Sequence, residues 1–284
     1  MKKKVAVARL SILSNSLLII MKVVVGVISG SVSIISEAIH SFMDLLAAVI
    51  AFFSVRISGR PADLKHPYGH GKFENISGVV EAILIFVAAF WIIYEAVKKI
   101  IHPEAIDSIW IGVVVMTISA VVNTFVSQKI YKVARETDSI ALEADALHLK
   151  TDVYTSIGVA VGLALIWITG YHFFDPVVAI LVALLILKES YNLLHKAYGP
   201  LLDTALPEED VETIRQTIKS HCLGKIDYHN LRTRKAGNFR YIDFHLNVPR
   251  DMTVKEAHDL CDQIEHGIKK PFDSTEVTIH VEYI

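Results

Sequence analysis

The chain contains two pairs of possible metal ligands, each a histidine and an aspartate four residues apart. His40 and Asp44 lie in the apolar stretch SEAIHSFMDLLAAVIAFF, and His148 and Asp152 lie in a second apolar stretch. Residues i and i+4 of an α-helix lie one turn apart on one face, so each pair would direct an imidazole and a carboxylate toward one point. Two such helices supply the four ligands of a tetrahedral divalent metal site. We therefore predict one metal ion between them.

A hydrogen-bonded structural pair is the simpler explanation of a single His–Asp spacing. It explains two identical pairs less well, because burying a carboxylate in hydrocarbon costs several kcal/mol unless a positive charge offsets it. Two imidazoles with two carboxylates suit Zn²⁺ and, less well, Co²⁺, Fe²⁺ or Cd²⁺, whereas Mg²⁺ and Ca²⁺ prefer oxygen ligands alone. We expect the protein to bind Zn²⁺ within a membrane and to move it across.

Composition and charge narrow the class of protein. Of the 284 residues, 52% are hydrophobic and 20% are charged, and the charged share lies below the average of about 25% for soluble domains. The formal net charge of -2 gives no basic excess of the kind that indicates nucleic-acid binding, so we expect no nucleic-acid partner. The two cysteines, Cys222 and Cys261, form no CxxC motif, and we interpret them as reduced cytosolic thiols.

Six apolar stretches reach the length of about 20 residues that crosses the hydrocarbon core of a bilayer. They are residues 7–28, 34–57, 76–97, 109–131, 140–168 and 174–194. Lysines and arginines gather in the loops on one side, which the positive-inside rule assigns to the cytoplasm. We expect a multi-pass protein of the cell (inner) membrane with both termini in the cytoplasm. We interpret the N-terminal MKKKVAVARL as the start of a retained first span.

Beyond residue 203 the sequence has the pattern of a soluble domain. LPEEDVETIRQTIKSH and TVKEAHDLCDQIEHGIKKPF predict helices, NLRTRKAGNFRYIDFHLNVP predicts a β-hairpin, and STEVTIHVEYI predicts a final strand. The order αββαβ indicates a small open-faced α+β sandwich. The expected fold is therefore an all-α six-helix membrane bundle over residues 1–203, followed by a cytoplasmic α+β domain over residues 204–284.

Further polar residues interrupt the apolar stretches. Ionisable groups at membrane depth are costly and usually mark a pathway or a contact inside the bundle. We expect Lys22 and Lys150 to lie near helix ends, where a long side chain can reach the membrane interface. Glu81 lies deeper, and a structural contact with Ser14 or Asn15 is one explanation for it.

A third group of possible ligands lies in the loop DLKHPYGHGKFE. Pro67 and Gly69 favour a turn that would let Asp63, His66 and His70 converge on an ion at the membrane face. A polar loop that binds phosphate, or binds nothing, fits the same spacing equally well.

A fourth group is spread over the terminal domain. Its members are His229, His245, His258, His280 and Glu282. A single histidine on a strand or helix is usually solvated, and the sequence alone does not bring these five residues together.

Three motifs, SEAIHSFMDLL, HPYGHGKFE and EADALHLKTDVYTS, make the chain resemble the cation diffusion facilitator family over nearly its whole length. The resemblance is strongest to bacterial zinc and ferrous-iron efflux members. It implies six membrane helices, a cytoplasmic ferredoxin-like domain, a homodimer, and export of divalent metal in exchange for protons. The transport site implied is His40, Asp44, His148 and Asp152. Many bacterial iron and zinc members carry Asp at the first position, so histidine there matches the zinc-preferring pattern.

The resemblance also implies roles outside the membrane. It implies an interfacial metal site on the three loop residues and a two-metal cluster, formed by the terminal-domain group, at the dimer interface. Glu282 departs from the best-known family pattern, which has Asp at this position. Lys72 and Asp203 match a pair that interlocks charges between subunits. The segment VARETDS between the fourth and fifth spans lacks the histidine-rich loop of many eukaryotic zinc transporters.

Metal and protons would compete for the four membrane ligands, because imidazole must be neutral and carboxylate ionised to bind Zn²⁺. An unperturbed imidazole has a pKa of about 6.5, so its protonation is accessible near physiological pH. We predict a cycle in which the site takes metal from the cytoplasm, opens outward, exchanges metal for external protons and returns. The membrane potential adds about 2.3 kcal/mol per inward charge per 100 mV.

Two other functions compete with transport. A membrane-bound metal sensor or scaffold would bind ions without moving them. An intramembrane metallohydrolase would need a general base and an open ligand position, whereas four protein ligands fill the site here. We therefore do not expect an enzyme.

Overall fold

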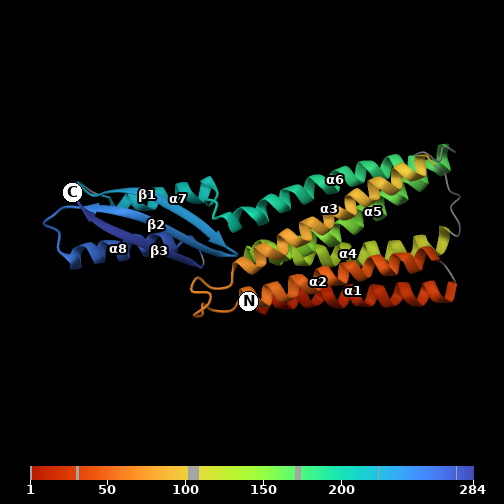
Figure 1. Ribbon diagram of the computed structural model, residues 1–284, viewed down its shortest axis with the longest axis horizontal. Helices are drawn as coiled ribbons and strands as arrows, with labels where there is room; N and C mark the ends of the chain where they lie inside the picture. The colour runs from red at the N-terminus through yellow and green to blue at the C-terminus, as the bar shows by residue number, and fades with distance from the viewer. Residues whose placement is uncertain (1, 30–31, 102–108, 170–173, 223, 273) are drawn as a thin grey trace. The chain divides into compact units, whose positions relative to one another are not determined.

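The computed structural model describes residues 2–29, 32–101, 109–169, 174–222, 224–272 and 274–284. The chain divides into two compact units, Met1–Tyr198 and Gly199–Ile284. Within the described residues, the first unit is formed by α1 (Lys2–Ser29), α2 (Val32–Ser58), α3 (Lys72–Ile101), α4 (Ile109–Thr137), α5 (Ile140–Thr169) and α6 (Phe174–Tyr198) (Figure 1). The second unit is formed by η1 (Gly199–Leu202), α7 (Glu208–His221), β1 (Asp227–Ala236), β2 (Phe239–Val248), α8 (Val254–Lys269) and β3 (Thr275–Tyr283). The expected fold class, a six-helix bundle followed by an αββαβ domain, is confirmed.

Every expected span lies inside one of the long helices, and the helices continue beyond the apolar stretches. In α4, for example, Lys132, Arg135 and Glu136 lie beyond the apolar stretch but still within the helix, because these residues have high helix propensity. Among the described residues, Lys2–Val25, Lys72–Lys98 and Pro176–Leu202 are long and apolar enough to cross a bilayer by length and composition.

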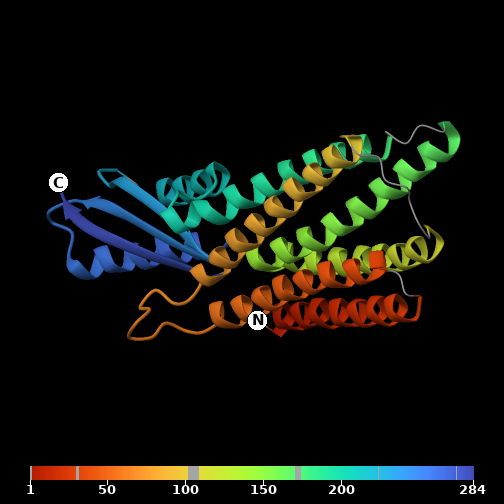
Figure 2. The same cartoon turned by 45° about the vertical axis from the view of Figure 1, so that its right-hand side comes forward.

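The helices of the first unit pack in pairs, α1 with α2, α4 with α5 and α3 with α6 (Figure 1, Figure 2). α5 contacts α2, α3 and α6 as well as α4. Small residues permit these close contacts. A Cβ on Gly78 of α3 would lie 3.0 Å from the Cβ of Ala197 in α6, and a Cβ on Gly158 of α5 would lie 2.8 Å from Cγ2 of Val182 in α6. Close backbone approach at small residues is typical of helix packing in membranes.

A buried ion pair joins the ends of several helices on one side of the first unit. Lys4 of α1 and Glu74 of α3 are 7% and 1% exposed, and Nζ of Lys4 lies 2.9 Å from Oε1 of Glu74. The hydroxyl of Ser58 in α2 donates to the same oxygen at 2.8 Å, and that of Ser139, just before α5, donates to Oε2 at 2.5 Å. Because both carboxylate oxygens have donors, hydrogen bonds and the lysine together offset the cost of burial.

In the second unit β2 is the central strand, with β1 antiparallel to it on one side and β3 parallel on the other. Phe244 and Leu246 of β2 are buried and share a core with Ile214 of α7 and Ile264 of α8. Successive residues of a strand point to opposite faces, so His245 lies on the face away from this helix-covered core.

Removing one partner of the buried Lys4–Glu74 pair should destabilise the first unit. Lys4→Met or Glu74→Leu leaves one charge buried without its counter-charge, which typically costs about 3–5 kcal/mol. We expect the thermal unfolding temperature in detergent to fall clearly in each single variant, and to recover in part when both substitutions are combined.

The matched control is the surface pair of Lys3 and Glu136, whose charged atoms lie 3.7 Å apart with side chains 77% and 44% exposed. Lys3→Met and Glu136→Leu should each change the free energy of unfolding by less than about 1 kcal/mol. Equal changes in the free energy of unfolding at the two pairs would contradict the claim that burial makes the Lys4–Glu74 pair costly to break.

Candidate metal sites

The two His–Asp motifs meet between α2 and α5. Nε2 of His148 lies 2.9 Å from Oδ1 of Asp44. The Asp44 side chain is 7% exposed and the His148 side chain is 13% exposed, so this contact is largely shielded from solvent. One ligand from each motif therefore reaches a common buried point, which is the convergence that a shared metal site requires.

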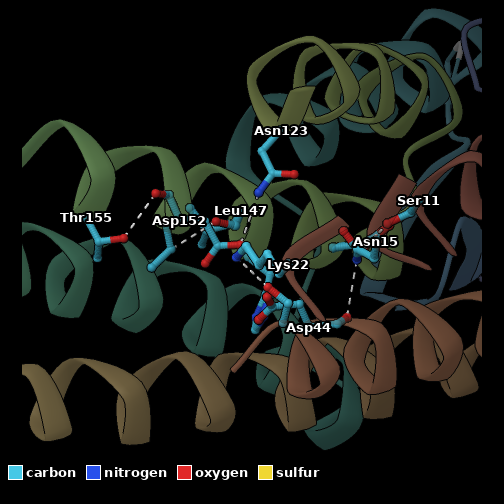
Figure 3. A network of polar contacts seen from close by, with 12 residues as sticks. Ser11, Asn15, Lys22, Asp44, Asn123, Leu147, Asp152 and Thr155 are labelled. Carbon is cyan, nitrogen blue, oxygen red and sulfur yellow. Dashed lines mark hydrogen bonds and ion pairs between the residues drawn. The ribbon is translucent and has the colours of Figure 1, made fainter. Parts of the chain in front are cut away.

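The other two motif residues flank this contact. Asp152 is half-buried one turn further along α5, and its Oδ2 accepts a hydrogen bond from Nδ2 of Asn123 in α4 at 3.3 Å (Figure 3). His40 lies in α2, but its side chain lies outside the described residues. Nδ2 of Asn15 in α1 donates to the backbone oxygen of Asp44 at 3.4 Å. Amides from α1 and α4 thus hold the turns that carry both aspartates, and such outer contacts orient ligands for a metal ion.

Lys22 contradicts the expectation that its side chain reaches the membrane interface. It is 6% exposed, and its Nζ donates to Oγ of Ser41 in α2 at 2.6 Å. The physical reason is that α1 packs against α2. This packing turns Lys22 toward the bundle, where the Ser41 hydroxyl accepts a hydrogen bond from its ammonium group. Ser41 lies three residues before Asp44, so the ammonium group is close to the candidate site (Figure 3).

Glu81 is fully buried in α3, and the contact with Ser14 or Asn15 that offered one explanation for it is not formed among the described residues. Its Oε1 accepts a hydrogen bond at 3.2 Å from Ser77, one turn earlier in the same helix. Ser14 instead donates to a backbone oxygen of its own helix. A donor one turn away on the same helix is available without any tertiary contact, which explains the difference.

Sequence reasoning missed one buried acid beside the site, Asp145. It is 1% exposed, and its Oδ1 accepts a hydrogen bond from Ser11 of α1 at 2.9 Å. Its charge interacts with those of His148 and Glu81. The available signal was its position three residues before His148, because residues i and i+3 are neighbours on a helix surface.

Asp63, His66 and His70 converge in the loop between α2 and α3. Oδ1 of Asp63 lies 3.3 Å from Nδ1 of His66, and Oδ2 lies 3.5 Å from Nε2 of His70. One ligand atom of each residue lies within 4.8 Å of the others. Gly69 has a φ of 81°, a conformation that glycine adopts without steric cost, and this turn brings His70 back toward Asp63. These three residues could hold a divalent ion.

Backbone hydrogen bonds fix the Asp63 carboxylate. Its Oδ1 accepts from the backbone N–H of His66 at 2.7 Å and of Lys65 at 2.9 Å. The His66 backbone N–H is the main cause that lowers the pKa of Asp63 below its ordinary value, and the His66 imidazole contributes less. The carboxylate is therefore held in the ionised form that binds metal.

Three histidines form a row across the sheet of the second unit. His229 of β1 pairs with His245 of β2, which pairs with His280 of β3, and neighbouring ring centroids lie 5.0 Å apart. The carboxylate of Glu282 lies 3.5 Å from His229, 3.0 Å from His245 and 3.7 Å from His280. Strand register thus brings these four residues together on the open face of the sheet.

His258 does not join this row within one chain. It lies on α8, and its Nε2 is 3.7 Å from Oδ2 of Asp262 on the same helix, with both side chains exposed. α8 packs on the opposite face of the sheet from His245, so the five terminal-domain residues do not form a single cluster in one protomer.

Lys72 and Asp203 belong to different units. Lys72 is the first residue of α3. Asp203 follows η1 with a φ of 54°, and its Oδ1 lies 3.5 Å from Nη1 of Arg234. The interlock between subunits stays a prediction for this pair.

Family models match nearly the whole chain. A model described as the cation efflux transmembrane domain matches residues 8–202. A model described as the cytoplasmic domain of cation efflux proteins matches residues 206–284. The first match corresponds to the helical unit, and the second to the αββαβ unit.

Relatives of comparable length share about a third of their residues with this chain. The cation-efflux pump FieF of Klebsiella pneumoniae is 33% identical over 266 residues, which cover 93% of this chain and 88% of the pump. FieF of Yersinia pestis gives the same identity and coverage. An uncharacterized transporter of Synechocystis sp. is 36% identical over 255 residues, 90% of this chain and 82% of that protein.

Two solved structures concern the mode of action of CzrB, named there as a candidate zinc transporter. Both are 41% identical to this chain over 28% of its length, with a TM-score of 0.27. The match covers 99% of one structure and 90% of the other, which is the zinc form.

The cause of the low Asp63 pKa can be tested by removing one imidazole. His66→Ala keeps the backbone N–H that mainly lowers the pKa of Asp63, so the carboxyl should still titrate below its ordinary value of about 3.9. A lowered folded-state pKa stabilises the loop above the unfolded pKa, and this contribution is lost as the pH falls through the folded value. Carboxyl ¹³C NMR of metal-free protein measures the titration. A return to the ordinary pKa in His66→Ala would assign the effect to the imidazole instead.

Proposed function

This chain belongs to the cation diffusion facilitator family, and on that premise we propose that it exports Zn²⁺ from the cytoplasm in exchange for protons. Membership makes it a multi-pass membrane transporter of divalent metal with a cytoplasmic C-terminal domain, and not an enzyme. The proposal adds the ion, the exchange and the residues involved. The proposed transport site comprises His40 and Asp44 of α2 with His148 and Asp152 of α5.

The contact between His148 and Asp44 is the observation that carries the proposal. An imidazole nitrogen 2.9 Å from a carboxylate oxygen shares a proton with it, because a carboxylate can only accept when ionised. A metal ion can bind both atoms only after that proton has left the pair. Metal uptake and proton release are therefore linked at one contact, and protons arriving from outside would restore the contact as the metal leaves.

The ligand types support Zn²⁺ over the hard cations. Two imidazole nitrogens and two carboxylate oxygens suit a tetrahedral zinc ion, and Fe²⁺, Co²⁺ and Cd²⁺ are its competitors for the same set. The buried acids Glu81 and Asp145 lie near His148. When ionised, they would favour a cation of any of these kinds, so selectivity is assigned to the four ligands.

Transport requires the site to open alternately to each side. We propose that α2 and α5, which contact each other, change their relative position and thereby the separation of their ligands. Asn123 and Asn15 would keep the aspartate-bearing turns oriented during this change. The driving force is the proton gradient together with the membrane potential, worth about 2.3 kcal/mol per charge per 100 mV.

The proposed assembly is a homodimer in the inner membrane with both termini in the cytoplasm. The loop group (Asp63, His66 and His70) is proposed as a metal site at the membrane face. The histidine row on the open sheet face is proposed as a regulatory site between the terminal domains, where His258 of one protomer would meet ligands of its partner. Lys72 and Asp203 are the proposed interlock between subunits.

Replacing an aspartate of the proposed site should abolish transport without unfolding the protein. Asp44→Ala and Asp152→Ala each remove one of the four ligands, and we expect Zn²⁺ flux into proteoliposomes under a pH gradient to fall at least ~100-fold. Glu95→Gln is the matched control, because it removes a carboxylate of α3 that is 38% exposed and pairs with Lys98 at 4.0 Å.

Flux is measured with a zinc-sensitive dye, and folding by size-exclusion chromatography of the same samples. Wild-type flux in Asp152→Ala would contradict the ligand assignment. Zinc binding by the wild type with no gradient-driven flux would instead support the sensor or scaffold alternative.

Metal at the histidine row should bring the terminal domains of a dimer together. His245→Ala removes the central member of the row, and we expect it to abolish the Zn²⁺-dependent shortening of the distance between spin labels on the two domains. His266→Ala is the control, because His266 is an exposed histidine of α8 outside the group. Zinc-dependent shortening that persists in His245→Ala would overturn the regulatory assignment.

A further inference from the structure

A groove lined by apolar and charged side chains opens beside α5, between α4 and α6. Its volume is about 320 Å³, within the range of about 300–1,000 Å³ that is usual for small-molecule sites. Its lining includes the apolar residues Ala146, Leu147 and Leu193 and charged side chains from α5 and α6. α5 lies between α6 and α4 in both views of the molecule (Figure 1, Figure 2). Of the proposed transport ligands whose side chains the structure describes, Asp44, His148 and Asp152, none lines this groove.

The charged groups of the groove are arranged at two levels. On α5, Glu143 and Lys150 lie two turns apart, and Glu189 and Lys196 are spaced in the same way on α6, a separation of about 10 Å. At the outer level Lys196 Nζ lies 2.5 Å from Glu143 Oε2. At the inner level Lys150 interacts electrostatically with Glu189, but within the described residues the two form no ion pair.

The inner level therefore holds two opposite charges, Lys150 and Glu189, that do not contact each other directly. The Nζ of Lys150 lies instead 5.2 Å from the ring centroid of Tyr154. Glu189 is half-buried and Lys150 is exposed. The Glu189 carboxylate can accept hydrogen bonds from a cation, and the Lys150 ammonium group, which also hydrogen-bonds the Tyr154 side chain, can offer its remaining donors to an anion.

The groove lies on the cytoplasmic side of the membrane unit. Lys196 is in the last turn of α6, which leads into the cytoplasmic domain, and Glu143 is in the first turn of α5. The inner pair lies two turns further along both helices, away from these cytoplasmic ends. Pockets between membrane helices on the cytoplasmic side are a known location for lipid headgroups.

We propose that this groove binds the headgroup of phosphatidylethanolamine from the cytoplasmic leaflet. The ammonium group of the lipid donates to the Glu189 carboxylate, and its phosphate accepts from Lys150. Phosphatidylcholine has the same charges, but its methylated ammonium group has no N–H to donate. Phosphatidylglycerol has no cation for Glu189, and the two lysines and two glutamates of the groove cancel in net charge, so they give an anionic lipid no excess attraction.

Native mass spectrometry of the full-length protein tests the proposal. The protein is exchanged into detergent with equal amounts of phosphatidylethanolamine, phosphatidylcholine and phosphatidylglycerol of identical acyl chains. We expect phosphatidylethanolamine to be retained at least about tenfold over phosphatidylcholine, the effect of one charge-assisted hydrogen bond. Glu189→Gln should abolish this preference, whereas Lys150→Gln should lower retention of all three lipids.

The controls are Glu136→Gln and Lys129→Gln, which change exposed residues of α4 that do not line the groove, and both should keep the wild-type preference. Inorganic phosphate in excess should not displace the lipid, because it lacks the ammonium group; displacement would show that the groove binds free phosphate and contradict the proposal. A preference for phosphatidylglycerol, or a phosphatidylethanolamine preference that survives Glu189→Gln, would also overturn it. The outcome is independent of whether the protein exchanges Zn²⁺ for protons.

Discussion

The hydrogen bond between His148 of α5 and Asp44 of α2 is the interaction on which the account of this protein depends. It satisfies two groups that would otherwise be costly to bury, and it joins the two helices that carry the His–Asp motifs. In the proposed function, this contact holds a proton when it is closed and gives up that proton when a metal ion binds both groups. The same pair would then exchange a proton for a divalent ion.

Other charged side chains buried in the bundle also have hydrogen-bond partners. Among the described residues, each deeply buried ionic side chain contacts a specific partner on a neighbouring turn, helix or loop. Glu74 receives donors from three other segments, Lys22 donates to Ser41, and Asp145 accepts from Ser11. Such contacts are expected where no water is present to solvate a charge. Lys150 and Glu189 are less buried and form no ion pair with each other among the described residues, and we propose a lipid headgroup as their partner.

Sequence patterns predicted the parts of this structure that depend on local periodicity. The long apolar stretches predicted the helices, alternation predicted the strands, and the four-residue spacing placed His148 and Asp152 on one helical face. Patterns did not predict contacts that depend on how one element is rotated against another. Asp145 was missed because Ser11 lies in a distant helix, and Lys22 was misjudged because helix rotation decided its direction. The row of His229, His245 and His280 depends on strand register, which the sequence left open.

The most direct test of the central claim is zinc-edge X-ray absorption on full-length protein whose only intact metal ligands are those proposed for transport. The loop ligands would be removed by Asp63→Ala, His66→Ala and His70→Ala, and the terminal-domain ligands by His229→Ala, His245→Ala, His258→Ala, His280→Ala and Glu282→Ala. The account predicts one bound zinc per chain with two imidazole nitrogens and two carboxylate oxygens at about 2.0–2.2 Å. Loss of all bound zinc, or a site with a single imidazole, would contradict it.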